Sequence, residues 1–329
     1  MSDRQSWLKL TVEEALEPEL LICDPHHHLW DHPGNRYLLD EFQQDIGNGH
    51  RVVTTVFVEC LQGYRENGPD SLRPVGETQF VERLVNQQRG SKTAIAAGIV
   101  GFADLSLGAE VQATLEAHMQ ASERFRGIRH ASAWHSSDTI HNAHTNPPEG
   151  LLLDKQFLEG FACLRDKQLS FDAWLYHHQI PELIGLARAF PEVSIILNHM
   201  AGPLGIGPYS DRRQEVFNEW QNALAELASC ENVFVKLGGR AMTMSGFGWH
   251  KSRTPPGSAE LAKAMAPYCH ASIDLFGPDR CMFESNFPVD RASCSYTVLW
   301  NAFKRLTRKY SDSETAALFH DTASSVYRL

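Results

Sequence analysis

The chain has 329 residues, of which 43% are hydrophobic and 21% are charged, a balance typical of a globular protein with a full core. Its formal net charge of −10, without a dense run of Lys or Arg, argues against nucleic acid or an anionic membrane surface as a partner. An acidic N-terminus without a signal-peptide pattern, no apolar stretch of about 18 residues, and seven scattered cysteines predict a cytoplasmic protein with reduced thiols.

Short apolar runs recur along the chain and predict eight strands. The runs are rich in Val, Ile and Phe, as expected of strands that are buried on both faces of a parallel sheet. In chain order the predicted strands cover residues 21–23, 52–59, 94–100, 125–130, 169–176, 193–199, 233–237 and 281–286.

Stretches with a 3.6-residue hydrophobic period separate most of these strands and predict helices, for example at residues 76–88, 109–121, 180–190 and 213–229. Alternating strands and helices predict an α/β fold, namely a closed (β/α)8 TIM-like barrel, with a doubly wound open sheet as the alternative. The even composition predicts a single domain over residues 1–329, in which residues 1–20 form an N-terminal extension. Residues 63–73, 131–150 and 242–258 are expected to form loops over one end of the barrel.

Polar side chains follow nearly every predicted strand at its carboxyl end. Barrel enzymes place their chemistry at this end, so these side chains are expected to converge on one site. The candidate site residues are His26, His28, Glu59, Arg129, Tyr176, His178, His199, Lys236, Glu284 and Asn286.

Three histidines are the centre of the predicted site. His26 and His28 are two residues apart, so an extended backbone points both to the same side while His27 points elsewhere. His199, after the sixth strand, is expected to join them from across the barrel. Imidazoles bind metal ions and also transfer protons near neutral pH. The alternative is three structural, hydrogen-bonded histidines.

Three motifs carry a resemblance to a known family: DPHHHLW at residues 24–30, NHMAGP at 198–203 and FESNFP at 283–288. Together they resemble the amidohydrolase superfamily, in particular the branch of sugar-lactone hydrolases and 2-pyrone-4,6-dicarboxylate lactonase. The resemblance implies an amidohydrolase-type barrel that hydrolyses a lactone or similar cyclic ester. It also implies either one divalent metal ion, zinc or manganese, on His26, His28 and His199, or action without a metal.

The last motif departs from the family at one position. The family has Ser-Asp-aromatic-Pro on the eighth strand, and its aspartate is both a metal ligand and the proton-handling base. This chain has Asn286 there, and an amide cannot take a proton from water. Glu284 is the first replacement to consider, at a position where the family more often has glycine, and Glu59 is the second. Either glutamate instead serves as a structural ion-pair partner in the alternative interpretation.

Further residues are predicted to hold the substrate. Arg129 resembles the family's strand-four arginine and suits a carboxylate, although a structural salt bridge is its alternative. Lys236 is expected to polarise a carbonyl or to pair with an acid, and one of residues 176–178 should line the site. Asp172 is predicted to be a buried hydrogen-bonding partner. The loop at 131–150 should present Trp134 as a wall or lid, and most of its histidines, His130, His135, His141 and His144, as solvated side chains.

The function predicted from these residues is a hydrolase that acts on a lactone or a related carboxylate as its small-molecule substrate. One alternative is a metal-dependent decarboxylase of an aromatic or unsaturated acid, which the missing strand-eight aspartate disfavours. Another is a degenerate barrel that binds a ligand without turnover, which the many polar strand ends disfavour. A homodimer is the default expectation for the assembly.

Overall fold

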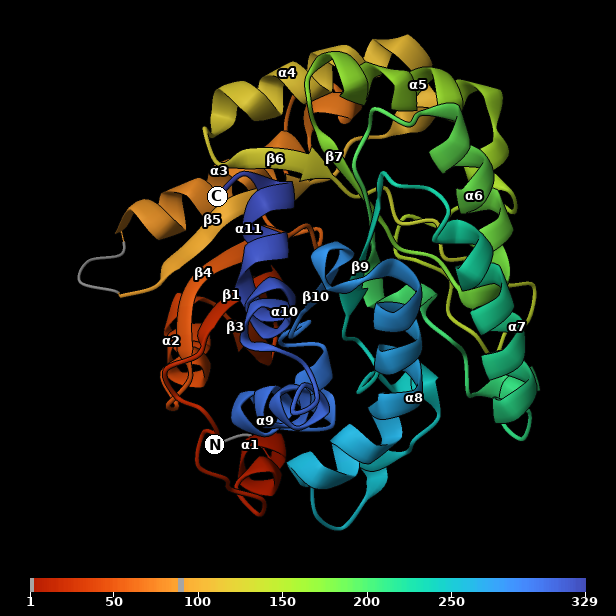
Figure 1. Cartoon of the computed structure of the whole chain (residues 1–329). Helices are drawn as coiled ribbons and strands as arrows, with labels where there is room; N and C mark the ends of the chain where they lie inside the picture. Colours follow the sequence, from red (N-terminus) through yellow and green to blue (C-terminus); the bar gives the residue numbers. More distant parts are fainter. Residues whose placement is uncertain (1–2, 88–91) are drawn as a thin grey trace.

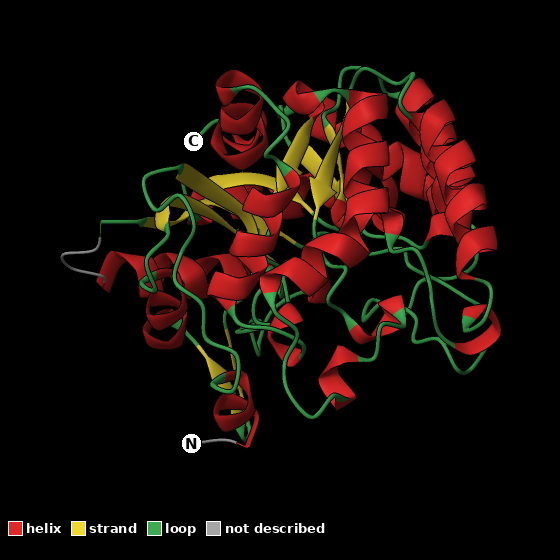
Figure 2. Cartoon of the chain, turned by 60° about the horizontal axis from the view of Figure 1, so that its bottom comes forward, coloured by secondary structure: helices red, strands yellow, loops and turns green. Residues whose placement is uncertain are grey.

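The structure is a computed structural model that describes residues 3–87 and 92–329. Eight parallel strands form one sheet, and helices cover its outer face (Figures 1 and 2). The predicted (β/α)8 barrel is confirmed. In sheet order the strands are β1 (Leu21–His27), β4 (Arg51–Val58), β5 (Ala94–Gly101), β6 (Phe125–Ile128), β7 (Ser170–Ala173), β8 (Ile195–Leu197), β9 (Val233–Leu237) and β10 (Cys281–Phe283).

The sheet closes where the residues after β10 meet the end of β1. The backbone N–H of Asn286 donates to the carbonyl of His26 at 2.9 Å, and that of His28 donates to the carbonyl of Phe287 at 2.8 Å. These two bonds bring the first and last motifs of the sequence side by side. The seam of the barrel therefore runs directly through the predicted site.

Several strand ends differ from the prediction. The first strand continues through the histidine motif to His27, whereas β6, β8 and β10 stop before their polar residues. After β8, His199, Met200 and Ala201 all have positive φ angles, of 54°, 52° and 58°. An extended strand cannot include these conformations, so His199 lies on a tight turn rather than on the predicted strand.

Helices pack outside the strands. The larger ones are α3 (Val75–Gln87), α4 (Val111–Ala121), α5 (Lys155–Asp166), α6 (Ile180–Ala189), α7 (Arg213–Leu227), α8 (Ser258–Phe276) and α9 (Tyr296–Leu306). The four predicted helices correspond to α3, α4, α6 and α7, although Gln88 lies outside the described residues. Smaller elements are α1 (Asp3–Leu8), the hairpin β2 (Trp30–His32) and β3 (Asn35–Tyr37), α2 (Leu39–Ile46) and α10 (Asp312–Ala316). Within the described residues no helix is both long and apolar enough to cross a membrane.

The chain ends in α11 (Thr322–Tyr327), which lies across the ring of strands (Figure 1). Ala323, Val326 and Tyr327 of this helix pack against apolar side chains from the strands, including Val56 and Ile196, in a core cluster separate from the large one between strands and helices. The helix therefore forms part of the packing inside the barrel, below the site.

Candidate active site

Glu284 lies between two of the predicted histidines at the carboxyl end of the barrel. Its Oε1 accepts hydrogen bonds from His199 Nδ1 at 2.6 Å and from the His199 backbone N–H at 3.1 Å. Its Oε2 lies 2.9 Å from His26 Nδ1. All three residues are buried, and one ligand atom from each lies within 4.8 Å of the others. Among the described residues this is the group with the geometry for a single metal ion.

Two glycines after β9 leave the space for this arrangement. A Cβ atom at Gly238 would lie 2.3 Å from Glu284 Cγ, and one at Gly239 would lie 2.6 Å from the Cβ and ring of His199. Both distances are too short for any side chain. The larger glutamate at position 284 is thus accommodated by missing side chains on the neighbouring strand end.

His28 is close to this group but is anchored separately. Its Nδ1 donates to the carbonyl of Val58 at 2.7 Å, which leaves Nε2 with its lone pair, and its ring centre lies 5.0 Å from that of His26. His27 points the other way, stacks on Phe42 at 4.2 Å and bonds Thr55, as the two-residue period predicts. Glu284, rather than His28, therefore completes the compact group with His26 and His199.

Burial sets the protonation of the three residues. It lowers the pKa of His26 well below its usual value, and the nearby charge of Lys236 lowers it further. Burial, and after it the charge of Arg129, also lowers the pKa of His199 well below its usual value. Burial also raises the pKa of Glu284 to about 8. Both imidazoles are therefore neutral at neutral pH and offer lone pairs, as binding to a metal ion requires.

Arg129, predicted to hold the substrate, and Glu59, the second candidate for the base, form a buried ion pair. Arg129 Nε donates to Glu59 Oε1 at 2.6 Å and one Nη donates to the Glu59 carbonyl at 2.7 Å. The remaining Nη lies 3.4 Å from His26 Nε2. From the loop, His144 Nε2 lies 2.9 Å from Glu59 Oε2. Glu59 thus fixes the guanidinium so that one nitrogen faces the histidines.

The Glu59 contacts predict a specific acid sensitivity. Burial alone raises the pKa of Glu59, but the charge of Arg129 and the contact with His144 outweigh it and lower the pKa from 4.5 to about 2. Glu59 loses its proton more easily in the folded than in the unfolded protein, so its ionised form stabilises the fold at pH values above its pKa in the unfolded chain. This contribution is lost as pH falls from about 4.5 towards 2. Urea midpoints from pH 5 to 3 should fall more steeply for wild type than for Glu59→Gln. Equal slopes would contradict the prediction.

Lys236 and Asp172 form a second buried ion pair inside the barrel. Lys236 Nζ lies 3.0 Å from Asp172 Oδ2 and 3.3 Å from His26 Nδ1, and both side chains are fully buried. Asp172 is thus the buried hydrogen-bonding partner that was predicted. Lys236 lies within β9 and reaches the histidines from inside the barrel, whereas Arg129 follows the end of β6.

The predicted residues Tyr176 and His178 bond to the loop at 131–150. The Tyr176 hydroxyl donates to the carbonyl of His141, and His178 Nε2 donates to the carbonyl of Trp134 at 3.1 Å. The neighbouring Trp174, which the prediction overlooked, packs its ring 4.9 Å from that of His199. Residues 176 and 178 thus hold the loop, and their role toward a substrate stays a prediction.

Most of the four loop histidines were expected to be solvated: His141 and His144 are exposed, His135 is half-buried and His130 is buried. His130 is buried, packs its ring on Phe102 and Phe157, and accepts a hydrogen bond from the Leu105 backbone N–H. His144 is exposed but bonds Glu59. The sequence showed that His130 and His144 lie in the loop. Which residues they contact depends on the path of the folded loop.

Residues 23–329 match the sequence model of a family described as Amidohydrolase. The chain belongs to the amidohydrolase family. This amidohydrolase is 34% identical to y4mH of Sinorhizobium fredii, an uncharacterized protein, over 94% of this chain and 99% of that one. It is 28% identical to an L-fucono-1,5-lactonase of Burkholderia ambifaria over 69% of this chain and 72% of that one. A structure of a Burkholderia multivorans amidohydrolase with bound zinc has the same fold, with a TM-score of 0.70 at 22% identity over 94% of this chain and 99% of that one.

The amide at Asn286 has a structural partner in this amidohydrolase. Asn286 Nδ2 donates to Asp290 Oδ1 at 3.2 Å, and Asp290 is fully buried. An aspartate at 286 would lack this amide donor to the buried Asp290. Asp290 was overlooked in the sequence, because a spacing of four residues indicates contact only within a helix and the segment after Asn286 is not helical. Burial raises the pKa of Asp290 well above its usual value.

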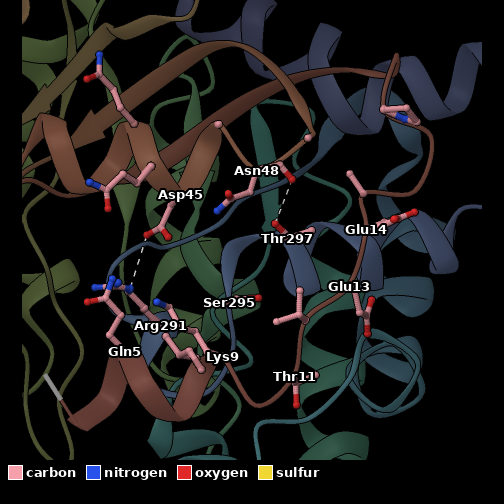
Figure 3. Close-up of a pocket in the computed structure, with 18 residues that line it drawn as sticks. Gln5, Lys9, Thr11, Glu13, Glu14, Asp45, Asn48, Arg291, Ser295 and Thr297 are labelled. Atoms are coloured by element: carbon pink, nitrogen blue, oxygen red, sulfur yellow. Dashed lines mark hydrogen bonds and ion pairs between the residues drawn. The ribbon is translucent and has the colours of Figure 1, made fainter. Parts of the chain in front are cut away.

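A large cavity lies on the outside of the amidohydrolase, away from these residues. It measures about 970 Å³ and is bounded by the N-terminal segment, the end of α2 and the start of α9 (Figure 3). Asp45 and Arg291 pair across it at 3.6 Å, and Thr297 bonds the Asn48 carbonyl. Its described lining includes none of the predicted site residues.

Proposed function

We propose that this amidohydrolase opens a lactone ring, a cyclic ester of a sugar acid or similar carboxylic acid, by attack of water on the ester carbonyl. The contact of Glu284 with both His26 and His199 is the observation that carries the proposal. It puts a carboxylate beside the histidines although the family aspartate is absent. The L-fucono-1,5-lactonase relatives favour a sugar lactone as the substrate class.

Glu284 is the group proposed to accept the proton of the attacking water. A general base works best when its pKa lies near the working pH, and burial raises the pKa of Glu284 to about 8. Its Oε1 is held by His199, whereas Oε2 has no hydrogen-bond partner and faces His26. The free oxygen is the one that we assign to proton transfer.

The same three residues fit a divalent metal ion. Two neutral imidazoles and one carboxylate, all buried and with one ligand atom from each within 4.8 Å of the others, match the donor set of catalytic zinc sites. His26, His199 and Glu284 would hold the ion, with His28 beside them. When bound, zinc or manganese would polarise the ester carbonyl and make the attacking water more acidic.

Arg129 and Lys236 supply positive charge on either side of His26. We assign the Arg129 nitrogen nearest to His26 to a carbonyl or carboxylate oxygen of the substrate, because Glu59 already occupies the other two guanidinium nitrogens. Lys236 adds a fixed charge below the histidines. Each such donor stabilises a developing oxyanion by about 3 kcal/mol in a water-excluded site.

Metal removal tests this assignment. Purified enzyme is assayed on a panel of sugar lactones before and after dialysis against a chelator, with bound metal measured by elemental analysis. We expect turnover to disappear with the metal and to return when zinc or manganese is added. Turnover that survives complete metal removal would contradict the metal assignment. Release of CO2 from aromatic acids, or binding of lactones without turnover, would instead favour the decarboxylase or the ligand-binding alternative.

A further inference from the structure

Tyr327 of α11 reaches into the barrel and bonds the carboxylate beneath the site. Its hydroxyl lies 2.6 Å from Asp172 Oδ1 and 2.7 Å from Oδ2, and the side chain is fully buried. Asp172 in turn contacts Lys236 Nζ at 3.0 Å, and this ammonium lies 3.3 Å from His26 Nδ1. An unbroken series of polar contacts therefore joins the last helix to the histidine cluster.

Asp172 depends on this phenol because its other donors all approach one oxygen. Lys236 and the weaker Asn198 amide, at 3.4 Å, both contact Oδ2, whereas Oδ1 is bonded by Tyr327. Buried carboxylate oxygens need donors. Without the phenol, the ammonium is the strongest donor left, and the carboxylate would turn to offer it both oxygens.

Lys236 has no rigid support of its own. A lysine side chain is a flexible stem, so the position of its ammonium is set by what holds the end. Here Asp172 holds Nζ from below, and the ring of Tyr327 lies 5.2 Å from the same nitrogen. A closer two-oxygen pair with Asp172 would draw Nζ away from His26.

We propose that Tyr327 is a positioning residue for the active site: its hydroxyl orients Asp172 so that the Lys236 ammonium stays against His26. The helix α11 then has a role in the chemistry besides its packing. This role concerns the lactone hydrolysis proposed above, but the location of the ammonium can be tested without any turnover.

The test compares Tyr327→Phe with Tyr37→Phe. Tyr37 is a matched control because it is equally buried and donates to a carboxylate, Asp45, at 2.7 Å outside the site. We expect Tyr327→Phe to lower kcat about tenfold with KM nearly unchanged, as removal of a partner behind a site residue commonly does. Tyr37→Phe should lose similar thermal stability but keep its kcat. Val326→Ala loosens the same helix while keeping the phenol, so it should keep kcat as well.

A crystal structure of Tyr327→Phe provides the readout that is independent of activity. We expect Lys236 Nζ to have left His26 Nδ1 and to contact both oxygens of Asp172. A kcat equal to that of Tyr37→Phe, or an ammonium still in place beside His26, would overturn the proposal. If wild type opens no lactone, the proposed function fails, and the ammonium position alone decides the role of Tyr327. If Tyr327→Phe does not fold, loss of kcat in Val326→Ala would overturn the proposal by showing that helix packing suffices.

Discussion

Replacing Glu284 with glutamine is expected to lower kcat for lactone opening on the order of 10³-fold, the middle of the range for loss of a general base. The amide keeps an oxygen that can accept the hydrogen bonds from His199, so the fold of the site should survive. It cannot accept a proton from water, and it is a weaker metal ligand than a carboxylate. Initial rates at saturating lactone, with metal content measured on the same sample, give the result.

Glu77→Gln is the matched control for this variant. Glu77 is also fully buried, burial raises its pKa to about 8, and its Oε1 accepts backbone N–H bonds from Cys60 and Gln62 at 2.8 Å. Its hydrogen bonds go to the backbone after β4 and not to the histidine cluster, so kcat should stay within about twofold of wild type. A Glu284→Gln enzyme with full metal content and more than about a tenth of wild-type kcat would remove Glu284 from the role of base.

Arg129→Met is expected to lower the free energy of unfolding by about 3–5 kcal/mol, the usual effect of leaving a buried charge without its partner. Glu59 is fully buried and receives two hydrogen bonds from Arg129, one to its carboxylate and one to its backbone carbonyl. His144 contacts the other carboxylate oxygen but lies on an exposed loop. Urea unfolding at neutral pH, followed by circular dichroism, measures the loss.

Two further variants separate the buried charge from the lost side chain. The double variant Glu59→Gln/Arg129→Met has no unpaired charge, so it should recover much of the lost stability. Arg124→Met removes a more exposed pair with Glu82, at 2.5 Å, and should lower the free energy of unfolding by no more than about 1 kcal/mol. A loss below about 1 kcal/mol for Arg129→Met would show that Glu59 is satisfied without the guanidinium.

The order of apolar and polar segments predicted the fold and most of the residues near the site. Parallel strands bring their carboxyl ends to one end of a barrel, so a polar residue after each apolar run converges on the same place wherever it lies in the chain. The two-residue period separated His26 and His28 from His27, because successive side chains of an extended strand point to opposite sides. Glu284 could be singled out because the family resemblance implies a base on the eighth strand, and Asn286 cannot act as one.

The pairing of these residues was decided by the tertiary structure alone. Arg129 and Glu59 are 70 positions apart, and their contact depends on the stagger between β4 and β6, which no local pattern encodes. Tyr327 meets Asp172 because α11 packs inside the ring of strands, and one tyrosine in a short helix carries no signal of that. The sequence by itself thus determined which chemical groups reach the barrel end, since the apolar run of each strand and the polar residue that follows it are local features of the chain. Only the tertiary structure decided which charge neutralises which, because a buried charge takes its partner from whatever side chain the packing brings within about 3 Å.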